Sequence, residues 1–157
     1  MIVYLVRPAP SRRSRTACQA GRRMAPCREG RRGCSLGGVK LRLENLPPSL
    51  APQRETLARC LEAMNRALPL HEVWLFGSHA RGEARPDSDV DLCLVAEGAE
   101  RQLQAAQRFS EAIWDIWPCP PFTLLPIAPE RLVEKKACGD FFYATVLGEG
   151  VLLATEN

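Results

Sequence analysis

The stretch Leu75–Leu92, which reads LFGSHARGEARPDSDVDL, contains the residues whose types and spacing could do chemistry. Gly77 and Ser78 directly follow an apolar run that favours a buried strand, and they precede a predicted helix start. A glycine at such a turn lets the backbone approach a ligand closely, and the free N–H groups there favour an anion such as phosphate. The Ser78 hydroxyl adds one more donor. The turn is therefore predicted to bind phosphate.

Two carboxylates follow after ten intervening residues. Asp89 and Asp91 begin a second apolar run, Val90–Ala96, which is typical of a strand. Because strand residues i and i+2 point to the same face, the two carboxylates should project together, with Cα atoms roughly 6–7 Å apart. With no His or Cys beside them, they suit a hard cation such as Mg²⁺. The turn would then hold a triphosphate, and the two acids would hold its metal.

Each half of this pattern also has a plain structural explanation. Gly-Ser is a common turn, and a single Asp-x-Asp often marks the solvated start of a strand. Two other motifs do not fit the context: an aspartyl-phosphate phosphatase places its Asp-x-Asp after an apolar strand, whereas here the apolar run follows. A Walker-type phosphate loop needs Gly-Lys-Ser or Gly-Lys-Thr, which this sequence lacks.

Hydrophobic periodicity predicts the elements that must position these residues. The expected order is a helix over Ala51–Leu68, a strand over Val73–Phe76, the turn with a short helix, a strand over Val90–Ala96, a helix over Arg101–Trp117, a strand over Phe122–Ile127, a helix from Pro129, a turn or helix over Phe141–Leu147, and a short apolar tail, Val151–Leu153. Pro126 favours an edge position for the third strand. This order predicts an α/β or α+β fold, with a small sheet covered by helices.

The charge distribution separates a basic N-terminal segment from an acidic remainder. Of the 157 residues, 1–36 hold nine arginines and one glutamate, whereas 37–157 hold twelve basic and seventeen acidic side chains. We expect 1–36 to be a disordered extension, 37–49 a linker, and 50–157 one domain. The acidic remainder and an aromatic content of 6% argue against direct nucleic-acid binding. The apolar runs are too short for a transmembrane helix.

Two interpretations of residues 1–36 stay open: a disordered part of the protein, or translated sequence upstream of a start at Met24 or Val39. The spacing of Cys18, Cys27 and Cys34 includes no CxxC pair, so a zinc site there is weakly supported. The other four cysteines, Cys60, Cys93, Cys119 and Cys138, are scattered among apolar residues and are interpreted as reduced thiols of a cytoplasmic protein.

Gly77-Ser78, ten residues and then Asp89-x-Asp91 resemble the signature of the minimal nucleotidyltransferases of the DNA-polymerase-β superfamily. Phe76, Ala80-Arg81-Gly82 and Ser88 also match. The resemblance extends over about residues 50–157. It implies a mixed sheet with flanking helices, Mg²⁺, and ATP or another NTP. Gly77 and Ser78 would contact the phosphates, and Asp89 and Asp91 would bind the metal.

For the function, the resemblance implies transfer of an NMP, such as AMP from ATP, to a hydroxyl of a protein or small molecule. It also implies an antitoxin that pairs with a small all-helical HEPN-type toxin. The family pattern places a third carboxylate on the next strand, but residues 116–129 contain no Asp or Glu. Thr123 stands near the expected place, and it is no general base at neutral pH. Asp115 and Glu130 are the nearest acids by sequence. The alternative is therefore a catalytically weakened nucleotide-binding subunit that acts by complex formation.

Five further side chains could have either a functional or a purely structural role. Arg81 could screen phosphate charge, as could Arg85 with less support, or both could be ordinary surface arginines. His79 is expected to be a partly exposed polar residue. Trp114 and Trp117 are expected in the core or on a partner surface.

Overall fold

The computed structural model of the chain describes residues 4–6 and 39–156, which contain one six-stranded sheet in the order β1-β5-β4-β3-β6-β2. Among these strands β4 and β5 are parallel, and all other neighbours are antiparallel. The strands are β1 (Tyr4–Val6), β2 (Val39–Leu41), β3 (Leu70–Phe76), β4 (Val90–Ala96), β5 (Phe122–Ile127) and β6 (Val151–Glu156). The predicted mixed sheet flanked by helices is thereby confirmed.

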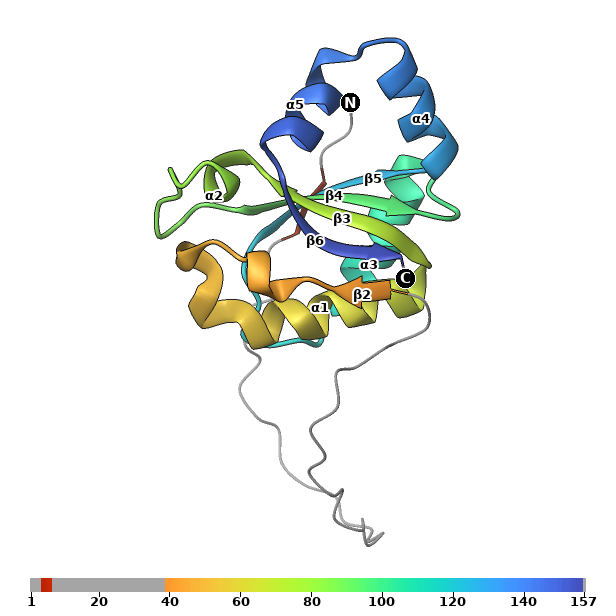
Figure 1. Ribbon diagram of the computed structural model, residues 1–157. Helices are drawn as coiled ribbons and strands as arrows, with labels where there is room; N and C mark the ends of the chain where they lie inside the picture. Colours follow the sequence, from red (N-terminus) through yellow and green to blue (C-terminus); the bar gives the residue numbers. More distant parts are fainter. Residues whose placement is uncertain (1–3, 7–38, 157) are drawn as a thin grey trace, which may run out of the picture.

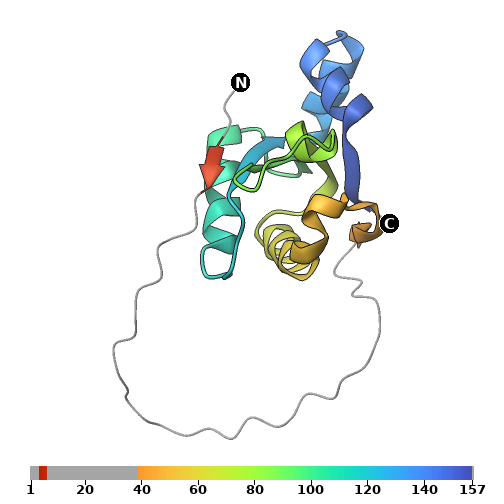
Figure 2. The same ribbon diagram turned by 90° about the vertical axis from the view of Figure 1, so that its left-hand side faces the viewer.

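Helices cover both faces of this sheet. Two short 3-10 segments precede the first α-helix, and the full set is η1 (Leu43–Asn45), η2 (Pro48–Gln53), α1 (Arg54–Ala67), α2 (Gly77–Ala80), α3 (Gln102–Ile113), α4 (Pro129–Ala137) and α5 (Phe141–Glu149). Helices α1 and α3 pack on one face, and α4 and α5 stand on the other (Figures 1 and 2). The short α2 projects beyond one end of β3 and β4 (Figure 1).

Strand β4 is buried on both faces from Leu92 onward, which explains the apolar run from Leu92 to Ala96. Val90, Leu92 and Leu94 join the core under α1 and α3, whereas Cys93 and Val95 join a second cluster under α4 and α5. Because side chains alternate along a strand, a residue two before Cys93 points toward α4 and α5. That residue is Asp91, so its carboxylate lies on the side of the sheet that α4 and α5 cover.

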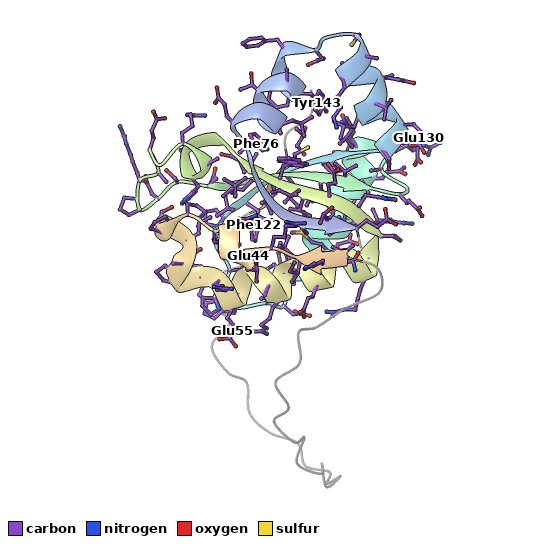
Figure 3. The ribbon with its side chains drawn as sticks, in the orientation of Figure 1. Glu44, Glu55, Phe76, Phe122, Glu130 and Tyr143 are labelled. Carbon is purple, nitrogen blue, oxygen red and sulfur yellow. The ribbon has the colours of Figure 1, made fainter. Side chains whose placement is uncertain are left out.

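The same alternation separates the large aromatic side chains. Phe122 is fully buried in the core that α1 and α3 cover, whereas Phe76 and Tyr143 belong to the second cluster. Figure 3 shows Phe76 and Tyr143 on the side of α4 and α5, with Phe122 on the opposite side of the strands. The two cores thus meet at the central strands, which fixes the register of the sheet.

Two expectations about strand β5 and the N-terminal segment need correction. Strand β5 is not an edge strand, because Tyr4–Val6 forms β1 beside it. Pro126 is tolerated since the pairing with β1 ends at Leu124, before the proline is reached. Within 1–36 the structure therefore has a strand where disorder was expected. The rest of that segment, with Cys18, Cys27, Cys34 and Met24, lies outside the described residues.

The expected linker and the expected apolar tail are both strands of the sheet. Val39–Leu41, inside the range 37–49, forms β2, and Val151–Glu156 forms β6 between β3 and β2. Asn45 also donates a side-chain hydrogen bond to the Leu152 carbonyl at 2.9 Å. The sequence pattern predicted neither strand in full. A three-residue strand such as β2 is too short to show alternation of apolar and polar residues, and only part of β6 is apolar.

Helix α3 ends at Ile113, four residues before the predicted end at Trp117. Trp114 and Trp117 follow it with 62% and 60% of their surface exposed, so neither belongs to the core. No helix among the described residues has the length and apolar character needed to cross a membrane.

Candidate active site

The turn between β3 and α2 is built around Gly77. Strand β3 ends at Phe76, and Gly77 adopts φ +73°, in the left-handed region that a residue with a side chain rarely enters. The Gly77 and Ser78 carbonyls accept hydrogen bonds from the N–H groups of Arg81 and Glu83 at 3.2 and 2.9 Å. The first N–H groups of a helix have no partner within it, so the N–H groups at this turn are available to an anion.

The Asp91 carboxylate lies against this turn. Phe76 and Asp91 are register partners across β3 and β4. An ideal Cβ on Gly77 would overlap Oδ2 of Asp91 and would stand 2.9 Å from its Cγ. Glycine is therefore required at position 77 for two reasons. Its backbone adopts a left-handed φ, and the Asp91 carboxylate occupies the space that a side chain would need. The predicted phosphate turn and the predicted metal ligand thus meet at one point.

Asp89, Asp91 and Thr123 surround the start of strands β4 and β5. Asp91 and Thr123 are register partners, and the Thr123 hydroxyl donates a hydrogen bond to the Asp91 carboxylate. Asp89, two residues earlier, is partly buried, as is Asp91, while Thr123 is buried. These oxygen atoms form a donor set with no nitrogen or sulfur ligand in it.

Burial raises the pKa of Asp91 above its ordinary value, and the negative charge of Asp89 raises it further. The Thr123 hydrogen bond and the charges of His79 and Arg81 partly offset this rise in pKa. In the part of the chain that the structure describes, neither Asp89 nor Asp91 forms an ion pair. Two adjacent carboxylates without a bonded cation fit a hard divalent ion such as Mg²⁺.

A third carboxylate does not join this pair on β5. Across residues 4–6 and 39–156 there is no cluster of three or more His, Cys, Asp or Glu side chains that could hold a metal. Asp115 follows α3, which covers the opposite face of the sheet. Glu130 is the second residue of α4 and lies beyond the far end of β5, whose last residue, Ile127, is itself about 13 Å along the strand from Thr123 at 3.3 Å per residue. Neither of these two acids lies on β5 beside Thr123.

Arg81 brings a positive charge to this end of the sheet. Its Nε donates to Oε2 of Glu83 at 2.9 Å, and its side chain is about half exposed. This hydrogen bond to Glu83 raises the pKa of Arg81 most, and the charges of Glu83, Glu149 and Asp91 raise it further. Glu149, the last residue of α5, is thereby another acidic residue at this end of the sheet. No spacing signal in the sequence connects Glu149 to the turn, because only the packing of α5 on β3 brings it there.

His79 is buried, with 5% of its surface exposed, which corrects the expectation of a partly exposed residue. Its Nδ1 lies 3.1 Å from Ser49 Oγ, and its Nε2 lies 3.4 Å from the Ser88 carbonyl. Ser88 directly precedes Asp89, so the imidazole ties α2 to the segment that carries this carboxylate.

A cavity of about 360 Å³ lies next to His79, at the start of β4. His79, Ser88, Arg85 and Val90 line it, while Asp89 and Asp91 do not. Val90 faces the core of α1 and α3, so Arg85 lies on the far side of the strand from Asp91. This placement does not bring Arg85 to the predicted phosphate site. The backbone N–H of Arg85 donates instead to Ser88 Oγ at 2.8 Å, which closes the loop before Asp89.

One family profile matches the part of the chain that carries this site. The sequence profile of the nucleotidyltransferase domain matches residues 57–138, just over half of the chain, from α1 through β3, β4 and β5 to the residue after α4. The bifunctional uridylyltransferase/uridylyl-removing enzyme of Xanthomonas campestris pv. campestris strain B100 is 43% identical over 65 residues, and the enzyme of strain 8004 is 40% identical over 65 residues.

These alignments cover 40% of this chain, which spans about 7% of the length of the curated relatives it matches. No solved structure matches the chain. The profile covers both halves of the site, the glycine turn and the paired carboxylates, together with the three strands that hold them. This chain belongs to the nucleotidyltransferase domain family.

Proposed function

We propose that the protein is a Mg²⁺-dependent nucleotidyltransferase that moves an NMP, with AMP from ATP as the first candidate, to a hydroxyl group. The observation that carries this proposal is the contact between the Asp91 carboxylate and Gly77, because it joins a phosphate-binding turn to a metal ligand. Neither half alone would indicate a nucleoside triphosphate. Together they match the two needs of nucleotidyl transfer, a grip on the leaving pyrophosphate and a neutralised α-phosphate.

The residues of the site divide this work. The N–H groups at Gly77 and Ser78, with the Ser78 hydroxyl, bind the β and γ phosphates, and Arg81 exchanges Glu83 for a phosphate oxygen. Asp89 and Asp91 hold the metal. When bound, Mg²⁺ supplies Lewis-acid stabilisation of the charge that develops on the phosphate oxygens. The acceptor hydroxyl attacks the α-phosphorus in line and loses its proton to solvent, while the bond from the α-phosphorus to the bridging oxygen breaks and pyrophosphate leaves.

The acceptor is a hydroxyl on a protein or small molecule rather than a nucleic-acid primer. Residues 37–157 carry a net negative charge, which disfavours a nucleic-acid primer as the acceptor. The named activity of the Xanthomonas relatives, uridylyl transfer, makes UTP the second nucleotide to test. We place the reaction in the cytoplasm, where nucleoside triphosphates are supplied.

A second candidate function follows from Thr123. Because a threonine hydroxyl is no base at neutral pH, the site supports nucleotide binding better than rapid turnover. In this candidate the protein is the antitoxin of a toxin–antitoxin pair and acts by forming a complex with a small all-helical HEPN-type toxin. The exposed Trp114 and Trp117 after α3 support a partner surface, because large exposed aromatic side chains are enriched at interfaces.

Label transfer tests the enzyme proposal. The protein is incubated with α-labelled ATP or UTP, Mg²⁺ and the product of the neighbouring reading frame, and label on protein or small molecules is measured. We expect transfer in the wild type and its loss in Asp89→Asn and Asp91→Asn. Label that survives both substitutions would show that the site is elsewhere.

The second candidate is tested with calorimetry and co-purification. Binding of Mg²⁺-ATP without label transfer, together with a stable complex with a small all-helical protein encoded by a neighbouring reading frame, would favour the antitoxin that acts by complex formation. Glu83→Gln is a useful companion variant, because it frees Arg81 from its ion pair. It should tighten ATP binding if Arg81 contacts phosphate, and it should leave complex formation unchanged.

A further inference from the structure

Two cysteines that are distant in the sequence meet behind the candidate active site. Cys60 lies on the buried face of α1, and Cys119 lies in the segment between α3 and β5. Their Sγ atoms are 3.9 Å apart, across 59 positions of sequence. Cys60 is fully buried, whereas Cys119 is partly exposed. The pair therefore combines one thiol that solvent can reach with one that it cannot.

The pKa values of the two thiols are shifted in opposite directions. The two thiols share a hydrogen bond, which lowers the pKa of Cys119, whereas the same bond and burial raise the pKa of Cys60. A thiolate is the nucleophile in disulfide exchange, so the reachable sulfur is also the one that is activated. Cys93, the other buried thiol among the described residues, is a poorer nucleophile, because burial raises its pKa to about 12. No described thiol lies beside it.

We propose that Cys60 and Cys119 form a reversible disulfide that fastens α1 to the start of β5. The reaction begins when the Cys119 thiolate attacks a sulfur of a small-molecule disulfide such as oxidised glutathione, which releases one glutathione thiolate. The Cys60 thiol then loses its proton, and its sulfur attacks Sγ of Cys119 and releases the second glutathione thiolate. Two protein thiols are oxidised, one glutathione disulfide is reduced to two thiols, and the two protons pass to the released thiolates.

The geometry requires a movement of about 2 Å, from the present sulfur separation to the 2.03–2.05 Å of an S–S bond. The segment from Trp117 to Pro121 is irregular, so it can move toward α1 without breaking a strand or helix. Its last residue is tied to the site, since the Pro121 carbonyl accepts from the N–H of Val90 at 2.8 Å. Val90 lies between Asp89 and Asp91. The disulfide would therefore restrain the segment that supports both carboxylates.

Peptide mapping tests this inference on the full chain. The native protein is incubated with oxidised glutathione, free thiols are alkylated, and peptides are analysed by mass spectrometry with and without reduction. We expect one dominant linked species, Cys60 to Cys119, lighter by two hydrogen atoms than the reduced pair and restored by dithiothreitol. The oxidised protein should also unfold at a higher temperature, because the bond closes a long loop.

The variants keep the proposal falsifiable. Cys138→Ser removes an exposed thiol whose described hydrogen bond goes to the Lys135 carbonyl, and it should leave the link intact. Cys60→Ala should trap glutathione on Cys119, and Cys119→Ser should leave Cys60 unmodified. Stable glutathione on Cys119 of the wild type, with Cys60 still free, would overturn the proposal. So would an unmodified Cys119 in a sample whose Cys138 has reacted.

Discussion

The Asp91 carboxylate occupies the space that a side chain on Gly77 would need. This relationship joins the end of β3 to the start of β4 through the register pair of Phe76 and Asp91. It places a carboxylate beside N–H groups that a phosphate would use. The consequences for stability and activity can be tested one residue at a time.

Gly77→Ala should disable the site, and Gly82→Ala is its matched control. Both glycines adopt φ +73°, but a Cβ on Gly82 would meet no atom within 4 Å. The backbone cost of about 1–2 kcal/mol is therefore common to both variants, and the overlap with Asp91 adds about 1–3 kcal/mol for Gly77→Ala alone. Urea unfolding measures the stability difference, and calorimetry measures Mg²⁺-ATP binding. Equal losses in the two variants would contradict the close contact.

Asp91→Asn should stabilise the metal-free fold while it abolishes the Mg²⁺ response. Because burial and Asp89 raise the pKa of Asp91, its charged form costs stability at neutral pH. That cost falls as the pH drops through the raised pKa, and it is gone below the ordinary value of 3.8. The variant's advantage in melting temperature should thus be largest at neutral pH. Label transfer should fall by about 100-fold or more. Wild-type protein that Mg²⁺ does not stabilise would contradict the metal site.

Thr123→Asp should increase turnover by restoring a third carboxylate. Position 123 is paired with Asp91 on the neighbouring strand, so a new carboxylate there would reach the acceptor hydroxyl and the metal. General-base catalysis is worth about 100-fold or more, and we expect at least a tenfold gain in label transfer. Thr123→Asn is the uncharged control of the same size. A variant that binds Mg²⁺-ATP with wild-type affinity but gains no turnover would favour the non-catalytic function.

Asp140→Ala should loosen α5 and make the protein less sensitive to acid. The Asp140 carboxylate accepts hydrogen bonds from the N–H groups of Phe142 and Tyr143 at 3.1 and 3.3 Å and from Lys135 Nζ at 2.8 Å. These bonds lower the pKa of Asp140 below its ordinary value of 3.8. Its contribution is therefore complete above pH 3.8 and is lost as the pH falls through the lowered pKa.

Melting temperatures measured from neutral pH to below pH 3.8 test this expectation. The wild type should be the more stable protein at neutral pH, and the two curves should converge in acid. Glu134→Ala is the control, because Glu134 forms an exposed pair with Arg131 on the neighbouring helix α4. A difference that persists unchanged in acid would show that the carboxylate charge is not responsible.

The sequence alone determined those parts of the protein whose signals are local. The spacing of Gly77, Ser78, Asp89 and Asp91 predicted the turn and the paired acids, because a glycine turn and an i, i+2 strand pair depend on neighbours a few residues away. The absence of an acid in 116–129 likewise pointed to Thr123, which the register then placed beside Asp91. Strands β3, β4 and β5 were predictable for the same reason, since each is a short apolar run between breakers.

Only the tertiary structure decided what depends on partners distant in the chain. Strands β1, β2 and β6 are short or partly polar, and their hydrogen bonds come from strands about 80–120 residues away, so no local period reveals them. His79 is buried because Ser49 and Ser88 provide its hydrogen bonds, and Cys60 meets Cys119 because α1 packs beside the segment before β5. Side-chain burial and side-chain contacts depend on how distant segments of the chain pack against one another. A pattern of neighbouring residues does not reveal that packing.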